Sequence, residues 1–163
     1  MVEKMRIYLI GMPGCGKSTL GKVLAKQLNY DFIDMDQYIE RQACMFIDEI
    51  FDAYGEEYFR ALESNILKEF QNLDNIVVAT GGGVIKNKQN KEFLQGICVY
   101  LSSDLNDIRL RLQQSEIVRP LLKTKSVEEL YQERKDLYEY FADITVENKN
   151  IEDTIAKIME AIQ

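Results

Sequence analysis

Apolar residues form short continuous runs along the chain, and these runs alternate with stretches of helical period. Each run is apolar throughout rather than at every second position, which predicts a strand buried on both sides. The predicted strands are 5–10, 30–35, 76–80, 97–101 and 144–146. Buried strands that alternate with helices are typical of a parallel sheet covered on both faces. The pattern therefore predicts a three-layer α/β domain.

The predicted helices are marked by apolar stripes and by one capping signal. Apolar residues recur every three or four positions after Leu20 and again from Ile151, as on one face of a helix. Ser126 followed three residues later by Glu129 is a capping box, which predicts a helix from there to about Phe141. Further helices are expected from about positions 56 and 104.

Composition narrows the functional classes. No repeat, low-complexity tract or linker divides the 163 residues, so we expect a single domain over 1–163. The net charge of −7 argues against a role on nucleic acid, and the apolar runs are too short for a membrane span. The chain has no histidine, which excludes His-based acid–base catalysis, and its three scattered cysteines suit no disulfide framework. We expect a cytoplasmic protein.

Residues 11–18, Gly-Met-Pro-Gly-Cys-Gly-Lys-Ser, match the phosphate-loop pattern in full, between a predicted strand and a predicted helix. Glycines let backbone N–H groups approach phosphates closely, at the positive end of the helix. Lys17 supplies a cation for the β- and γ-phosphates, and the Ser18 hydroxyl is a ligand for Mg²⁺. We expect ATP to bind at Gly14, Cys15, Gly16, Lys17, Ser18 and Thr19, with Cys15 as a small filler.

Asp34 and Asp36 stand at the end of the second predicted strand. Because residues two apart on a strand point to the same side, both carboxylates should face one region at the carboxyl edge of the sheet. Phosphoryl transfer to an alcohol needs a metal ion and a base near the acceptor hydroxyl, and two carboxylates can divide these tasks. The alternative is that they only cap and begin a helix near Tyr38.

Glycines and arginines at the same predicted edge indicate an anionic acceptor. Gly81–Gly83 follow the third strand and can expose backbone to a ligand, or form no more than a loose turn. Arg60 has Glu63 three residues on, a spacing that can hold the guanidinium. Arg134 falls on the apolar stripe of its helix, so it must face a cleft or a carboxylate. With Arg119, these arginines suggest that the acceptor carries a carboxylate.

Other features separate kinases from other phosphate-loop proteins. A GTPase should carry N-K-x-D, whereas 87–90 reads Asn-Lys-Gln-Asn, and the chain is short for a motor ATPase. The polar stretch 113–116 indicates a mobile segment that could close over the site and exclude water. A small-molecule kinase is the interpretation that these features favour.

Taken together, the motifs resemble the shikimate kinase family over essentially the whole chain. No single segment is specific, but their order and spacing are. The matching segments are the phosphate loop at 11–18, Asp-Met-Asp at 34–36, Ile-Asp-Glu-Ile-Phe at 47–51, the stretch 55–63, Gly-Gly-Gly at 81–83, Arg-Pro-Leu-Leu at 119–122 and Arg-Lys-Asp-Leu-Tyr at 134–138.

This resemblance implies a phosphate-loop kinase fold with a five-stranded parallel sheet, a helical substrate-binding region at about 34–62 and a lid at about 112–125. It implies transfer of the γ-phosphate of ATP to the 3-hydroxyl of shikimate, with Mg²⁺, by a monomer. This is a step toward chorismate and the aromatic amino acids.

The resemblance also implies roles for individual residues. Those with catalytic roles would be Lys17, Asp36 and Arg119; those binding shikimate would be Asp36, Arg60, Gly81, Gly82, Gly83 and Arg134, with Arg119 near its carboxylate and a pocket wall of Ile47, Phe51, Phe59 and Glu63. Ser18 and Asp34 would serve the metal. Arg119 and a lid arginine, Arg111 or the nearby Arg109, would reach the ATP phosphates.

Two alternatives stay open. A kinase for gluconate or a nucleotide would share the loop, although it should not share the whole set of residues from Ile47 to Glu63. A catalytically silent module that senses nucleotide or shikimate would have no need of Asp34 and Asp36.

Overall fold

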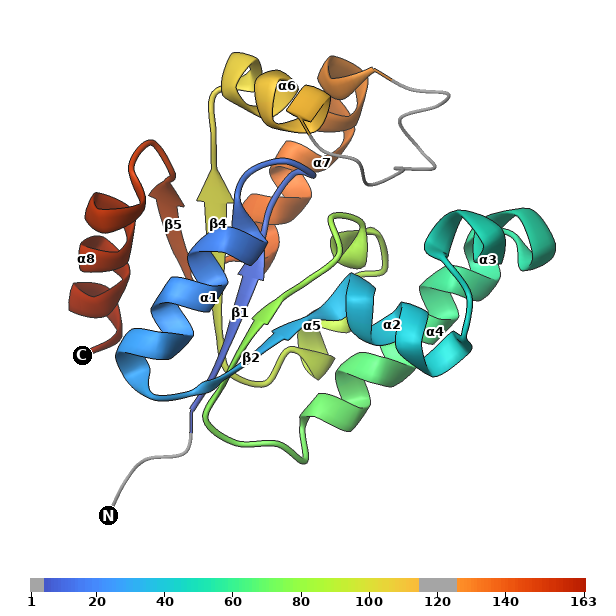
Figure 1. The fold of residues 1–163 in the computed structure, drawn as a ribbon, viewed down its shortest axis with the longest axis horizontal. Coiled ribbons are helices and arrows are strands. Elements are labelled where there is room, and N and C mark those ends of the chain that lie inside the picture. The colour runs from blue at the N-terminus through green and yellow to red at the C-terminus, as the bar shows by residue number, and fades with distance from the viewer. Residues whose placement is uncertain (1–4, 115–125) are drawn as a thin grey trace.

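A computed structural model describes residues 5–114 and 126–163. Its five strands form one all-parallel sheet in the order β2-β3-β1-β4-β5. The strands are β1 (Arg6–Ile10), β2 (Asp31–Asp34), β3 (Ile76–Ala79), β4 (Ile97–Ser102) and β5 (Ile144–Glu147). All five lie where the sequence predicted strands, and Figure 1 shows their carboxyl ends at one edge of the sheet.

The helices form the two outer layers. Figure 1 shows α1 and α8 on one side of the sheet, with α7 behind it and α2, α3 and α4 grouped beside it. The bounds are α1 (Lys17–Leu28), α2 (Met35–Ala43), α3 (Ile47–Tyr54), α4 (Glu56–Phe70), α5 (Asn90–Phe93), α6 (Leu105–Gln114), α7 (Val127–Phe141) and α8 (Ile151–Ile162), with a 3-10 turn η1 (Val84–Lys86). The predicted α/β/α fold is confirmed.

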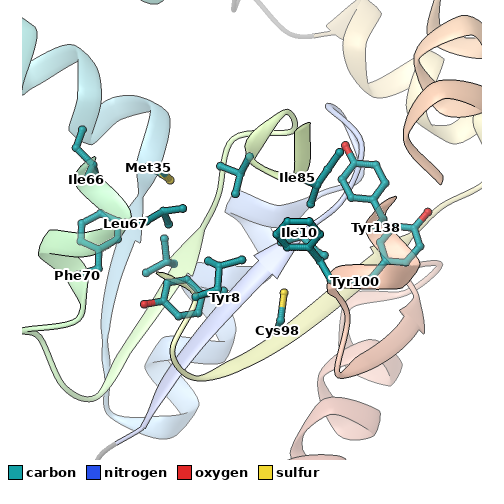
Figure 2. Packing of buried hydrophobic residues seen from close by; sticks show 14 of the residues in the cluster. Tyr8, Ile10, Met35, Ile66, Leu67, Phe70, Ile85, Cys98, Tyr100 and Tyr138 are labelled. Atoms are coloured by element: carbon teal, nitrogen blue, oxygen red, sulfur yellow. The ribbon is translucent and has the colours of Figure 1, made fainter. Parts of the chain in front are cut away.

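Two apolar clusters show why the sheet is covered on both faces. Ile7 and Leu9 of β1 pack with α1 and α8, whereas Tyr8 and Ile10 of the same strand pack with residues of α4 and α7. Successive strand residues point to opposite faces, so a strand that is apolar at every position must be buried on both faces of the sheet. Figure 2 shows the second cluster, in which Tyr100 stacks on Tyr138 with ring centroids 5.1 Å apart.

Capping groups set where two functional helices begin. Ser126 accepts a hydrogen bond from the Glu129 N–H, so α7 starts where the capping box predicted. The Asp34 carboxylate accepts one from the Gln37 N–H, which starts α2 at Met35. The helix expected near Tyr38 therefore begins three residues earlier.

No helix in the described ranges 5–114 and 126–163 is long and apolar enough to cross a membrane. The predicted lid at about 112–125 falls mostly outside the described residues, and its first three positions belong to α6. The predicted substrate-binding region at about 34–62 corresponds to α2, α3 and the first half of α4.

Candidate active site

The loop from Gly11 to Gly16 joins β1 to α1 at the carboxyl edge of the sheet. Gly14 and Gly16 have φ values of 82° and 96°, in a region that side chains disfavour, so glycine is required here by the backbone itself. The Cys15 side chain is fully buried in the apolar cluster of α1 and α8, which fits a filler. Only the backbone of Cys15 can take part in binding.

Lys17 begins α1 and is nearly buried. Its Nζ donates to the carbonyls of Gly11 at 2.8 Å and Met12 at 3.0 Å. These partners are neutral backbone carbonyls, so they do not neutralise a cation beside the loop. A buried cation held by neutral carbonyls attracts an anion strongly, because a low-dielectric environment screens its charge weakly.

Ser18 and Asp34 lie together beside the loop. The Ser18 hydroxyl donates to Asp34 Oδ2 at 2.7 Å. Oxygen donors of this kind are those that Mg²⁺ prefers, and this ion commonly uses one or two protein carboxylates while keeping several waters. In the described part of the chain no group of three or more acidic or cysteine side chains could hold a metal alone. The pair fits Mg²⁺ bound mainly by phosphate and water.

Asp36 lies in the site as predicted, but on a different element from the predicted one. It was expected on a strand, on the same side as Asp34, but it lies in the first turn of α2. The strand argument was wrong because Asp34 caps a helix and ends β2 at once. Both carboxylates still line one cavity, and the positive end of α2 favours a carboxylate in its first turn.

Arg60 and Glu63 form a buried ion pair on α4, as their spacing predicted. Arg60 Nη1 donates to Glu63 Oε1 at 2.6 Å, and the Glu63 side chain is 1% exposed. Burial raises the pKa of Glu63 to about 7, and the Arg60 guanidinium opposes this rise without cancelling it. The second carboxylate oxygen, Oε2, has no hydrogen-bond partner among the described residues.

Arg134 lies on α7 and is 2% exposed, although its helix face is otherwise apolar. Its Nε, like that of Arg60, is buried without a hydrogen-bond partner among the described residues. Both side chains line the same cavity. Two guanidinium groups whose buried Nε donors have no hydrogen bond can bind a carboxylate through paired hydrogen bonds.

The glycines at 81–83 have ordinary backbone angles, so conformation does not demand them. Space does. A Cβ on Gly81 would lie 2.6 Å from Glu63 Oε2 and 2.9 Å from Asp36 Oδ1, and one on Gly83 would overlap Arg60. Tyr138, labelled in Figure 2, donates its hydroxyl to the Gly82 carbonyl at 2.5 Å and fixes the turn. These glycines let charged side chains from α2 and α4 approach the backbone.

One cavity of about 780 Å³ joins these groups. The predicted residues that line it are Gly14, Gly16, Lys17, Ser18, Thr19, Asp34, Asp36, Ile47, Phe51, Phe59, Arg60, Glu63, Gly81, Gly82, Gly83, Arg111 and Arg134. Cys15 is absent from the lining, and Arg119 lies outside the described residues. The expected phosphate-binding and acceptor-binding residues therefore face a common space.

Two arginines of α6 have different surroundings. Arg111 lines the cavity and donates to the carbonyl of Gly14 at 3.2 Å, in the phosphate loop. Arg109 instead bonds Asn106 and pairs with Glu128 at the start of α7. Of the two arginines, Arg111 is therefore the one that lies in the cavity beside the phosphate loop.

Sequence reasoning missed several residues of the site. Gln37, Glu40 and Asp48 add polar groups to the cavity wall, and the Glu40 carboxylate accepts the Ile47 N–H to join α2 to α3. Asn148 bonds the phosphate loop from the turn after β5. No motif marks these residues, because their contacts depend on how distant elements pack.

Comparisons with known proteins agree with this geometry. The family model described as shikimate kinase matches residues 13–163. A protein named shikimate kinase from Clostridium botulinum (strain Eklund 17B / Type B) is 42% identical over 164 residues, covering 98% of each chain. One named shikimate kinase 1 from Yersinia enterocolitica is 40% identical and covers 98% of this chain and 94% of its own.

Solved structures give the same result. Shikimate kinase from Acinetobacter baumannii in complex with shikimate superposes with a TM-score of 0.90 at 36% identity, covering 97% of this chain and 92% of its own. Shikimate kinase from Bacteroides thetaiotaomicron superposes with a TM-score of 0.88 at 32% identity, covering 98% of this chain and 99% of its own.

Proposed function

This chain belongs to the shikimate kinase family and is an ATP-dependent kinase, and we propose that it transfers the γ-phosphate of ATP to the 3-hydroxyl of shikimate. The products are shikimate 3-phosphate and ADP, in a step toward chorismate and the aromatic amino acids. The observation that carries the proposal is the shared cavity, which is lined by the phosphate loop, by the buried Arg134 and by the half-buried Arg60. Such a cavity suits ATP and a carboxylate-bearing alcohol together.

The phosphate-loop half binds the nucleotide. Backbone N–H groups around Gly14 and Gly16 surround the phosphates, and Lys17 neutralises the charge that develops on the transferred group. Ser18 and Asp34 would hold Mg²⁺, which would neutralise negative charge on the phosphates. Arg111 contacts the phosphates beside the Gly14 carbonyl.

The acceptor half binds shikimate. Arg60 and Arg134 take its carboxylate, and the backbone at Gly81–Gly83 lies against the ring. This orientation places the 3-hydroxyl at Asp36, which accepts the hydroxyl proton as the oxygen attacks the γ-phosphorus in line. Glu63 holds Arg60 in place by their 2.6 Å ion pair.

Further assignments rest on the family resemblance. Arg119 would serve catalysis and the ATP phosphates from a lid at about 112–125, within one domain over 1–163. We propose a cytoplasmic monomer that binds neither nucleic acid nor membrane. The acidic net charge of −7 supports the absence of a nucleic-acid partner.

Release of ADP, measured with shikimate, gluconate and AMP as separate acceptors, tests the function. We expect ADP release with shikimate to exceed that with either alternative by a factor of roughly 10³ or more, because those acceptors cannot fill the same buried polar contacts. Equal or faster release with gluconate or AMP would reject shikimate as the acceptor. A Lys17→Ala variant controls for contaminating ATPases.

A further inference from the structure

Asn148 lies in the turn between β5 and α8 and is 3% exposed. Its carboxamide is bonded at both ends. Nδ2 donates to the Cys15 carbonyl at 2.8 Å, and Oδ1 accepts from Thr154 Oγ1 at 3.1 Å. Its backbone N–H donates to the Ser102 carbonyl at 2.7 Å, so both side chain and backbone are fixed. A buried carboxamide held in this way has one orientation.

The bond to Cys15 orients the next N–H of the phosphate loop. The Cys15 carbonyl and the Gly16 N–H belong to one planar trans peptide, in which the two groups point in opposite directions. The Cys15 carbonyl accepts its shorter hydrogen bond from Asn148 at 2.8 Å and a longer one from the Ser103 hydroxyl at 3.4 Å. With the carbonyl directed at Asn148, the Gly16 N–H is directed away from it. Gly16 lines the cavity, and within residues 5–114 and 126–163 its N–H has no protein acceptor. Through this peptide, Asn148 thus directs the unbonded Gly16 N–H away from the turn between β5 and α8.

Close packing leaves this peptide little freedom. A Cβ on Gly16 would lie 2.6 Å from Asn148 Nδ2, so the carboxamide rests directly against the loop. Arg111 bonds the Gly14 carbonyl at 3.2 Å and the Asn148 carbonyl at 3.5 Å, which ties the same turn to a second loop peptide. The turn after β5 therefore supports the loop at two points.

We propose that Asn148 is a positioning residue for the nucleotide, which fixes the Cys15–Gly16 peptide so that the loop N–H groups meet the phosphates. The inference rests on the function proposed above, because it assumes that ATP phosphates bind this loop. The role needs a donor facing the Cys15 carbonyl. An aspartate of the same shape would place a second acceptor against that carbonyl and add negative charge beside the phosphates.

The test compares two buried asparagines. Asn90, on α5, is 2% exposed and is also bonded at both ends, to the Val84 carbonyl and the Ser64 hydroxyl, both at 2.7 Å and both away from the loop. Asn148→Asp should raise the ATP dissociation constant, measured by calorimetry with Mg²⁺ and no acceptor, by about tenfold or more. It should leave the shikimate KM within about twofold. Asn90→Asp should leave ATP affinity within about twofold, whatever it does to melting temperature.

Unchanged ATP affinity in Asn148→Asp would overturn the proposal, as would an equal rise in the KM for both substrates. If that variant does not fold, Asn148→Ala removes the same hydrogen bond without adding charge, and it should weaken ATP binding about fivefold or more. Unchanged ATP affinity in Asn148→Ala would also overturn the proposal. Because calorimetry with ATP alone involves no acceptor, a wrong acceptor assignment would not alter this result.

Discussion

The two glycine-rich segments of the cavity contain glycine for different reasons. In the phosphate loop, Gly14 and Gly16 have positive φ values, and the groups they present are backbone N–H donors. At 81–83 the backbone is ordinary, and glycine makes room for the charged side chains of Asp36, Glu63 and Arg60. The first glycine segment thus contributes main-chain donors, whereas the second lets charged side chains approach the main chain closely.

This difference affects how each half responds to change. The phosphate loop depends on backbone angles set within a few consecutive residues, with support from Asn148 and Arg111. A side-chain site depends on α2, α4 and α7 meeting at one turn, so a change on any of these elements can disturb it. Three predictions follow from treating the halves as separable, and a fourth concerns the stability of the acceptor half.

The largest effect should come from replacing aspartate by asparagine, at position 36 in one variant and at position 34 in another. Asp36→Asn should lower kcat by roughly 10²-fold or more while ATP and shikimate bind within about threefold of normal, because the proton acceptor is lost and the shape is kept. Asp34→Asn, its matched partner on the nucleotide side, should instead raise the Mg²⁺ concentration needed for half-maximal rate. Steady-state kinetics at varied Mg²⁺ separates the two, and near-normal turnover in Asp36→Asn would exclude it as the base.

Arg134→Ala should affect only the acceptor half. We expect the shikimate KM to rise about 10- to 100-fold, the loss expected for a charge-assisted hydrogen bond, with the ATP KM within about threefold. Initial rates with each substrate varied in turn measure both constants. Equal increases for ATP and shikimate would mean that Arg134 supports the fold rather than the acceptor.

Alanine at one glycine of each segment tests the two reasons for glycine. Gly81→Ala should raise the shikimate KM by about tenfold through contact with Glu63 and Asp36, and leave the ATP KM within about twofold. Gly16→Ala should do the reverse, because the new side chain meets both a strained φ and Asn148. If both variants affected the same substrate, the two halves would not be separable.

The smallest effect is a pH dependence of stability. The pKa of Glu63 is raised from its ordinary value to about 7, chiefly by burial, so the folded protein binds a proton that the unfolded chain releases above about pH 4.5. This contribution to folding is complete below that pH and is lost as pH rises through 7. The melting temperature of Glu63→Gln relative to the unmodified protein should therefore improve by a few degrees between about pH 5 and pH 8.

Glu56→Gln is the control for this pH dependence of the melting temperature, since Glu56 lies on the same helix as Glu63 but its pKa is lowered instead of raised. Burial favours a higher value, and Lys86 and Arg60 outweigh it and lower the pKa of Glu56. Its contribution is lost only as pH falls through the acid range, so no relative change is expected between about pH 5 and pH 8. A flat response in both variants would mean that Glu63 stays ionised throughout.

The sequence predicted most of the fold because buried strands and capped helices are local patterns. The phosphate loop was equally predictable, since its residues are consecutive and the backbone imposes their types. The Arg60–Glu63 pair was predictable from helix spacing alone. The family resemblance, carried by the order of many segments, identified shikimate as the acceptor.

Other features depend on packing that no local pattern contains. Whether Asp34 continues a strand or caps a helix is decided by the Gln37 N–H, and both outcomes fit the residues there. The reason for glycine at 81–83 requires knowing that α4 brings Glu63 to that turn. Asn148 meets Cys15 across 133 positions of sequence. Such contacts appear only once the sheet order is known.

The start of α2 has a consequence for how a protein of this kind can evolve. Asp34 and Asp36 are separated by one residue at a single helix terminus, so a change there must satisfy the nucleotide and the acceptor together. Arg60 and Arg134 stand on α4 and α7, which are separate elements from α2. We expect new acceptor preferences to arise by mutation of those two helices while the α2 terminus stays constant. Duplicated copies of the gene could then diverge in substrate and keep one phosphate-transfer apparatus.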